Sequence, residues 1–271
     1  MELFARSPLW LATIALLIVA ELLWRRHRRR GYDGRAALAT VGLALGNIPF
    51  ALLTGAVLGG IMTGGAALAP VHWPLRDWRS WVAGFLLFEF AYYWFHRASH
   101  RVRWMWASHA VHHSADELTL LASLRLGWTN LVSLGWAFYL PLILIGMPPL
   151  MVAMLRAFDL RYQFFLHTEA VGRLGPLEWL LNTPAHHRLH HASNAAYRDR
   201  NFGGVLIVFD RLFGTLAVER PDEPIRYGLA HRAPSHNPVT LALREWAIML
   251  RAAGHAPTLA AKLRALVAPP S

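Results

Sequence analysis

Residues 96–113 read HRASHRVRWMWASHAVHH, and residues 186–191 read HHRLHH. Together with a lone His167 between them, these two stretches hold ten of the fifteen histidines of the chain. Their spacings are HX3H once and HX2HH twice, and residues three or four positions apart lie on one face of a helix. Each group is therefore predicted to present its imidazoles in one direction. Three such faces supply more nitrogen ligands than one metal ion needs, so the pattern predicts a two-metal site.

The predicted ligands are the imidazoles of these groups and of the lone histidine between them. His186 is the least firmly placed of them, because on a helix it points about 100° away from the next residue. It is predicted either to bind a metal or to orient a neighbouring ligand. The complete set is His96, His100, His109, His112, His113, His167, His186, His187, His190 and His191.

Composition indicates a single membrane-embedded, all-α domain. The 271 residues are 55% hydrophobic, with 12 tryptophans and a mean hydropathy of +0.30. The absence of cysteine excludes disulfides, iron–sulfur clusters and thiolate ligands, so any metal is held by histidine with help from carboxylates. The net charge of +11 lies beside apolar segments, where it favours membrane topology and anionic lipid over nucleic acid as its explanation.

Apolar segments predict a polytopic helical bundle of about four spans, because roughly 20 apolar residues cross a bilayer. The basic run of residues 25–30 ends the first segment and is predicted to face the cytoplasm. Counting crossings from that run brings every histidine group to the cytoplasmic side, as a histidine-rich cap. The apolar segments are residues 3–24, 36–62 with a kink at Pro49, 80–95, and a helical hairpin of 127–145 and 149–165.

The domain prediction is one integral-membrane unit, residues 1–271, in three parts. Residues 1–80 hold two N-terminal spans, residues 81–220 form the histidine-bearing catalytic region, and residues 221–271 form an amphipathic tail. Helical spacing of Ala, Leu and Arg in residues 238–267 predicts that this tail lies on the cytoplasmic membrane surface.

Polar residues near the histidines are predicted to support them, because a ligand histidine needs its other ring nitrogen held. Glu89 lies seven residues before His96, on roughly the same helix face, and is predicted to accept a hydrogen bond from a ligand. A structural pairing of Glu89 with an arginine is an equal alternative. For Asp210 the alternative is a turn or helix cap bonded to Arg211. The catalytic candidates are Glu89, Glu169, Asn201 and Asp210, with Asp116, Glu117 and Asn182 as further acceptors.

Several longer motifs stand out: Tyr92-Tyr-Trp-Phe-His-Arg, His109-Ala-Val-His-His-Ser, Tyr162-Gln-Phe-Phe-Leu-His-Thr-Glu, Asn182-Thr-Pro-Ala-His-His-Arg-Leu-His-His and Asp210-Arg-Leu-Phe-Gly-Thr. They resemble the fatty acid hydroxylase / sterol desaturase superfamily, and within it alkylglycerol monooxygenase and its bacterial relatives. The resemblance covers roughly residues 80–230. It implies a non-haem di-iron site, two irons per chain, that uses O2 to hydroxylate or desaturate a C–H bond of a lipid, with ether-lipid oxidation as one form. It also suggests a reduced pterin as electron donor.

Two other classes of function use the same histidines. A membrane zinc hydrolase would activate water and would need a base, for which Glu89 or Glu169 could serve. A metal-handling membrane protein would store or move an ion, but a conduit would place ligands along the spans. The favoured hypothesis is therefore a multi-pass oxygenase of the bacterial inner membrane. It would act on a lipid at the cytoplasmic face and take electrons from a separate protein or a small reductant.

Overall fold

The computed structural model describes residues 8–270, and within them every regular element is helical apart from one isolated bridge between Leu181 and Leu206. The predicted all-α class is confirmed. Four short 3-10 turns are η1 (His112–Ser114), η2 (Leu120–Leu124), η3 (Gly135–Tyr139) and η4 (Gly175–Trp179). The α-helices are α2 (Pro8–His27), α3 (Gly34–Ala67), α4 (Trp78–Arg101), α5 (Arg103–His109), α6 (Leu140–Leu144), α7 (Pro149–Phe164), α8 (Pro184–His190), α9 (Val208–Leu212), α10 (Pro238–His255) and α11 (Leu259–Val267).

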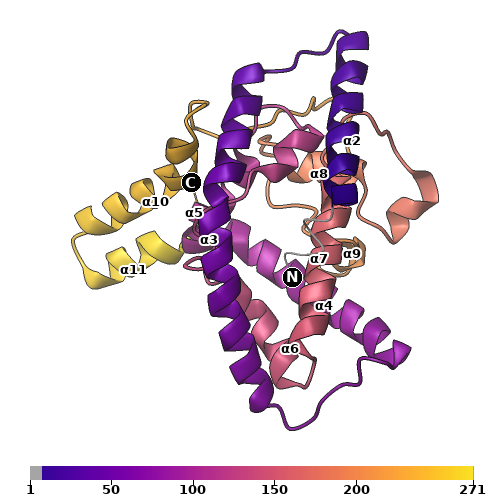
Figure 1. Cartoon of the computed structure of the whole chain (residues 1–271). Coiled ribbons are helices and arrows are strands. Elements are labelled where there is room, and N and C mark those ends of the chain that lie inside the picture. The colour runs from indigo at the N-terminus through magenta and orange to yellow at the C-terminus, as the bar shows by residue number, and fades with distance from the viewer. Residues whose placement is uncertain (1–7, 271) are drawn as a thin grey trace.

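α2 and α3 are long and apolar enough to cross a membrane, and they run in opposite directions (Figure 1). At about 1.5 Å per residue the 20 residues of α2 extend for roughly 30 Å and the 34 of α3 for roughly 50 Å. Their large apolar side chains face outward, as Leu9 at 80% and Leu38 at 73% exposure illustrate. The predicted span of residues 3–24 begins outside the described residues, and α3 continues past the predicted residue 62 with Pro49 inside it.

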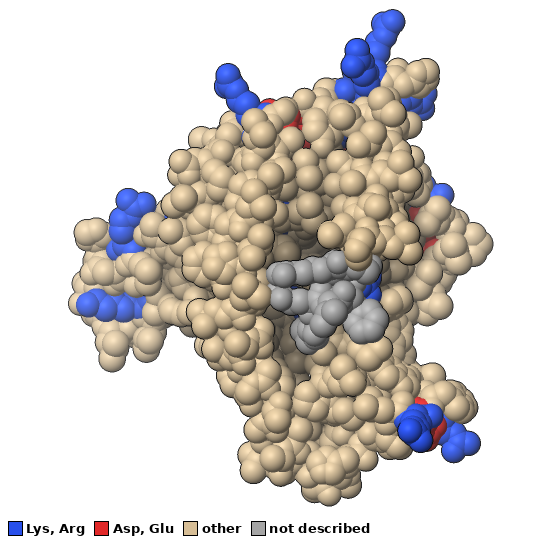
Figure 2. Space-filling model, in the orientation of Figure 1, with Lys and Arg blue, Asp and Glu red and all other residues tan. Residues whose placement is uncertain are grey.

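Charged side chains lie mainly at the edges of the molecule in the view of Figure 2, and the face between them is almost free of blue and red. Exposed leucines of α2 and α3 fit such a surface, since Leu16 and Leu45 are 69% and 62% exposed. An exposed apolar surface of this extent in a folded chain marks contact with lipid or with another protein.

α4 carries the first histidine group directly from the bundle, as predicted. It begins at an N-cap, Asp77, whose side chain accepts a hydrogen bond from the backbone N–H of Arg79, and it continues without a break through His96 and His100. Phe88 and Tyr92 on α4 pack in a buried cluster with Met147, Met151, Leu155 and neighbouring residues of α6 and α7. This cluster fixes the end of α4 from which the ligands project.

The predicted helical hairpin is half right. α7 forms, but residues 127–134 are irregular, and the first arm is reduced to η3 and α6. Close packing at Gly127 explains part of the difference, because a Cβ atom there would lie 2.6 Å from the carbonyl oxygen of Ser108. Leu134 has a left-handed backbone, φ 63°, which also interrupts a helix. The ten residues that remain, 135–144, extend for about 20 Å or less and are too short for a span.

α10 and α11 form the predicted amphipathic tail, seen at the side of the molecule in Figure 1. α10 packs against protein: it buries Leu241 and Ala242 beside Leu43 of α3, and Trp246 and Met249 beside Ala107 of α5. No residue of α11 is buried. The apolar face of α10 thus covers α3 and α5, and the placement of the tail on the membrane surface stays a prediction.

Candidate metal centre

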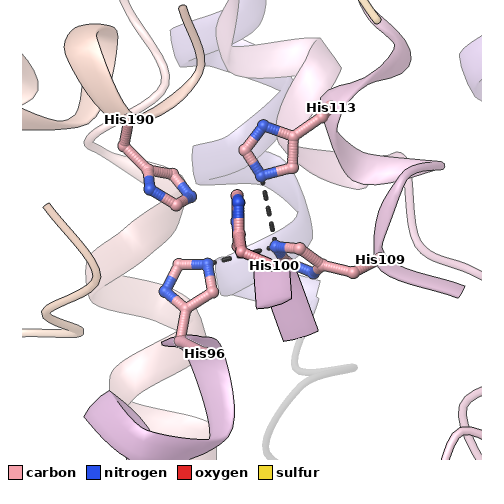
Figure 3. Close-up of side chains that lie close together, drawn as sticks. All are labelled: His96, His100, His109, His113 and His190. Atoms are coloured by element: carbon pink, nitrogen blue, oxygen red, sulfur yellow. Dashed lines mark hydrogen bonds between the residues drawn. The ribbon is translucent and has the colours of Figure 1, made fainter. Parts of the chain in front are cut away.

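Nine of the predicted ligands meet in two clusters. In each cluster one nitrogen from every ring lies within 4.8 Å of the others. Figure 3 shows the rings of the first cluster pointing toward a common centre from α4, from the region of α5 and η1, and from α8. The five-histidine cluster consists of His96, His100, His109, His113 and His190, and the four-histidine cluster of His112, His167, His187 and His191.

Each HX2HH group is divided between the two clusters. His109 and His113, four residues apart, join the five-histidine cluster, whereas His112 joins the four-histidine cluster. The second group has the opposite pattern: His187 and His191 join the four-histidine cluster and His190 joins the other. The prediction that each group points in one direction is confirmed for His96 and His100, which share a cluster, and is wrong for the two HX2HH groups. Each HX2HH group instead contributes to both clusters.

His186 belongs to neither cluster. Its ring is buried, and its Nδ1 lies 3.5 Å from the hydroxyl of Thr183. Its backbone carbonyl accepts a hydrogen bond from the side-chain amide of Asn201 at 3.0 Å. His186 directly precedes His187 in α8, and the rotation of about 100° per residue in a helix points its ring away from the cluster.

The spacing of ring nitrogens fits a metal in each cluster. The Nε2 atom of His109 lies 3.1 Å from that of His96 and 3.2 Å from that of His113. In the other cluster the Nε2 atom of His187 lies 3.1 Å from those of His167 and His191. Metal–imidazole bonds are about 2.0–2.1 Å long, so two such ligands at right angles have nitrogens about 3 Å apart.

Unpartnered nitrogens support the same fit. Within the described residues, the buried Nε2 atoms of His100 and His190 have no hydrogen-bond partner. Buried polar atoms are almost always satisfied, and exceptions indicate an absent ion or water. An all-imidazole donor set suits iron, zinc or copper.

Backbone carbonyls hold several of the rings. Nδ1 of His96 lies 2.8 Å from the carbonyl oxygen of Phe202, and Nδ1 of His190 lies 2.9 Å from that of Arg200. Nδ1 of His167 lies 2.7 Å from the carbonyl oxygen of Gln163, one helical turn earlier. A carbonyl oxygen can only accept, so Nδ1 donates in each case and the lone pair of Nε2 is left facing the cluster.

The sequence model of the fatty acid hydroxylase family matches residues 81–215, about half of the chain, and this segment contains all nine ligands. The chain belongs to the fatty acid hydroxylase family. No solved structure matches it.

Several curated proteins are similar to this chain over part of their length. Human alkylglycerol monooxygenase is 44% identical over 160 residues, which are 59% of this chain and 35% of the relative. The zebrafish (Danio rerio) alkylglycerol monooxygenase is 47% identical over 57% of this chain and 33% of its own. The ornithine lipid hydroxylase OlsE of Rhizobium tropici is 31% identical over 54% of this chain and 44% of its own. The chain spans about a third of the length of the alkylglycerol monooxygenases it matches.

Two of the predicted carboxylate acceptors, Glu89 and Asp210, accept hydrogen bonds from backbone N–H groups and not from an imidazole. Glu89 accepts hydrogen bonds from the backbone N–H groups of Val205 and Leu206, at 2.8 and 2.7 Å. Asp210 accepts from the backbone N–H groups of Phe202 and Gly203, at 2.8 and 2.7 Å. The prediction of a direct bond from Glu89 to a ligand is wrong, and so are the two alternative pairings with arginine. Both carboxylates instead fix the segment that presents the carbonyl of Phe202 to His96.

The other two catalytic candidates, Asn201 and Glu169, also bind groups outside the imidazole rings. Asn201 has a left-handed backbone, φ 55°, and its side-chain amide donates to the carbonyls of His186 and Ala217. Glu169 forms ion pairs with Arg25 and Arg30, at 2.9 and 3.0 Å. The sequence thus identified residues that stabilise the segments around the site, but it could not show which groups they bind.

Burial keeps the rings neutral. It lowers the pKa of His167 to about 4, and it holds the pKa of His109, His113, His187 and His191 well below the ordinary value, with neighbouring imidazoles adding to the effect. Neutral imidazole is the form that binds metals, so both clusters are ready to bind a cation at neutral pH.

A polar cavity of about 140 Å³ opens onto the clusters. His100, His113, His190 and His191 form one wall of the cavity, and Asp199 and the ion pair between Arg232 and Glu245 line it as well. Three of the four histidines belong to the five-histidine cluster, so the cavity is an approach to that cluster.

Proposed function

We propose that this member of the fatty acid hydroxylase family is a membrane di-iron oxygenase that uses O2 to hydroxylate or desaturate a C–H bond of a lipid. The observation that supports it most is the pair of imidazole clusters, with five and four ring nitrogens converging inside the segment that matches the family. The names of the relatives, alkylglycerol monooxygenase and ornithine lipid hydroxylase, support a lipid as substrate and suggest an ether lipid as one candidate.

Two bound irons supply the redox chemistry that activates O2 for attack on an alkyl C–H bond. The residues of the chain hold, orient and enclose them. Tyr92 and Phe202 pack against His96, with ring centroids 5.3 and 5.9 Å away, and Trp106 lies 5.6 Å from His113. These aromatic contacts limit water around the cluster and keep the rings from rotating.

Glu89, Asn201, Asp210 and Glu169 act as positioning residues in this proposal. The first three fix residues 201–206, whose carbonyl at Phe202 orients His96. Their function is to preserve ligand geometry, because misplacing a ligand by a fraction of an ångström weakens the metal site.

The enzyme is proposed to be a multi-pass protein of about four spans in a bacterial inner membrane, with the metal centre on the cytoplasmic side. The two long apolar helices and the basic residues after α2 support this orientation. Electrons come from a separate protein or a small reductant, with a reduced pterin as one candidate. The polar cavity beside the five-histidine cluster offers such a donor an approach from water.

The first experiment measures iron in detergent-purified protein beside a His112→Ala variant, with His72→Ala as control because that side chain is exposed and lies outside both clusters. We expect about two irons per chain in the wild type and in the control, and a loss in His112→Ala. Lipid extracts supplied with isotopically labelled O2 should gain the label if the enzyme hydroxylates.

The alternatives give different results in the same experiment. Hydrolytic activity that persists with zinc and needs no O2 would support the zinc hydrolase, although Glu89 and Glu169, its candidate bases, are bonded elsewhere. No bound metal after growth with added iron would overturn the proposal.

A further inference from the structure

α2 contacts the rest of the protein through two buried charged side chains, besides the packing of Trp10 against Phe164 and Phe165. Among its residues only Glu21 and Arg25 are buried, at 5% and 4% exposure, although most of the helix is apolar. A charged side chain in or near a membrane is costly unless it has partners, so two buried charges on an otherwise exposed apolar helix indicate a specific interaction. Glu21 and Arg25 are four residues apart and share one face of the helix.

Glu21 bonds to two segments that are far apart in sequence. Its Oε2 accepts a hydrogen bond from the backbone N–H of Leu120 at 2.7 Å, and its Oε1 accepts one from the hydroxyl of Thr168 at 2.5 Å. Leu120 and Thr168 are themselves buried. Charge-assisted hydrogen bonds of this kind are the stronger ones in proteins.

Arg25 bonds to the same two segments one helical turn later. Its Nη2 lies 3.3 Å from Oε1 of Glu117, and its Nη1 lies 2.9 Å from Oε2 of Glu169. Its Nε donates to the carbonyl oxygen of Gly31 at 2.8 Å, which closes the turn after α2. The basic run is thus more than a topology signal, because its first residue is a buried structural group.

The two segments carry ligands of the four-histidine cluster. Thr168 directly follows His167, and residues 117–120 follow the group that contains His112. The Nε2 atoms of His112 and His167 lie 3.1 Å apart. Within the described residues, Nδ1 of His112 has no hydrogen-bond partner, so its ring depends on the placement of its backbone.

We propose that Glu21 is a positioning residue for the four-histidine metal site, acting with Arg25 to hold the segments of His112 and His167 at the separation the metal requires. The inference rests on the two-metal site of the proposed function and adds a structural element outside the segment that matches the family. α2 is then part of the metal site, although it supplies no ligand.

The test compares three variants of the full-length protein in detergent. Glu21→Leu removes both hydrogen bonds and keeps an apolar helix, whereas Glu21→Gln keeps an oxygen for Leu120 and an amide that can donate to the hydroxyl of Thr168. The matched control is Thr13→Leu, two turns earlier on α2, because that hydroxyl bonds only to the carbonyl of Leu9 on its own helix. Metal per chain and the rate of metal release to a chelator are measured.

In Glu21→Leu we expect one of the two metals to be released about 10–100-fold faster than in the wild type, the usual effect of losing a group that supports a ligand. Glu21→Gln should recover most of the wild-type rate, and Thr13→Leu all of it. Thr168→Val, a milder change, should reproduce the direction of the effect if Glu21→Leu folds poorly.

Combination with a ligand variant identifies the affected site. Adding Glu21→Leu to His187→Ala should change little, because the four-histidine metal is already lost, whereas adding it to His100→Ala should still speed the release of the four-histidine metal. Equal release rates in Glu21→Leu and wild type, or equal loss from both clusters, would overturn this inference alone. A wild type that binds no metal would overturn the proposed function as well.

Discussion

The two histidine clusters have different numbers of ligands and different support. The five-histidine cluster has rings fixed by nearby backbone, as the carbonyls of Phe202 and Arg200 show, and it borders the polar cavity. In the four-histidine cluster His112 and His187 have an Nδ1 without a partner, in the part of the chain that is described, and the ligand-bearing segments are tied to α2. Two rings of the five-histidine site are thus held by the carbonyls of residues 200–202, whereas in the four-histidine site only His167 has such a bond, to Gln163, among the described residues, and the segments of the site also depend on α2.

The largest difference should come from removing one ligand from each cluster. His187→Ala leaves three histidines in its cluster, and His100→Ala leaves four in the other. We expect His187→Ala to lose its metal entirely, giving about one metal per chain, and His100→Ala to retain both metals with weaker binding. His187→Ala should lose nearly all lipid oxidation, because the proposed chemistry needs two irons, and His100→Ala should lose less because both metals remain bound.

Metal analysis and a chelator titration separate the two variants. His186→Ala is the matched control, since this buried histidine lies in the same helix as His187 but in neither cluster. Equal metal loss in His187→Ala and His100→Ala would mean that the number of ligands does not distinguish the sites.

A smaller effect, confined to the five-histidine cluster, is expected from Asp210→Ala. This variant leaves the buried N–H groups of Phe202 and Gly203 without an acceptor, at a cost of about 1–3 kcal/mol each. The unfolding temperature of the metal-free protein in detergent should fall by about 5–10 °C. Metal release should accelerate from one site only, because the carbonyl of Phe202 contacts His96 and no ring of the other cluster is bonded to it. Faster metal release from both sites would contradict the assignment of Phe202 to the support of the five-histidine cluster alone.

Acid should lower the folding stability of the metal-free protein, because both clusters contain buried histidines with a lowered pKa. Burial lowers the pKa of His167 from its ordinary 6.5 to about 4, and the direction is the same for His109 and His187. Below pH 6.5 the unfolded chain takes up protons that the folded chain does not, so folding stability falls as the pH decreases from 6.5 toward 4.

Thermal unfolding of metal-free and metal-loaded protein across this range tests the pH prediction. The metal-free protein should lose stability steadily below pH 6.5, whereas the loaded protein should resist until protons displace the metal. A metal-free unfolding temperature that stays constant from pH 7 to 5 would contradict burial of neutral histidines.

Local spacing predicted the ligands but not their division into clusters. Eight of the nine histidines could be named because HX3H and HX2HH follow the helical period, yet α5 ends at His109 and η1 turns His112 toward the other cluster. That turn depends on packing between segments distant in sequence. The same limit applies to hydrogen bonds: any residue has a carbonyl, so the sequence could not show that Phe202, Arg200 and Gln163 hold the rings.

One signal for α2 was available in the sequence. Glu21 is the single acidic residue in the apolar run before the basic residues, and such a charge calls for a partner. The partner itself, Thr168, lies 147 residues away, and no local pattern connects the two. The hairpin failed for a comparable reason, since close packing of Gly127 against Ser108 is a tertiary contact.

The smallest effect is expected from Glu89→Gln, and it tests whether this carboxylate positions backbone or transfers protons. A single oxygen, Oε2, accepts both bonds, from Val205 and Leu206, and the amide oxygen of glutamine can take its place. We expect lipid oxidation within about threefold of wild type and unchanged metal content, whereas Glu89→Ala, which frees two buried N–H groups, should destabilise the fold by about 2 kcal/mol or more. The pH profile of the reaction decides between the roles. A proton-transferring Glu89 would make the glutamine variant inactive at every pH with both metals bound, and a positioning Glu89 leaves the profile of Glu89→Gln superimposable on that of the wild type.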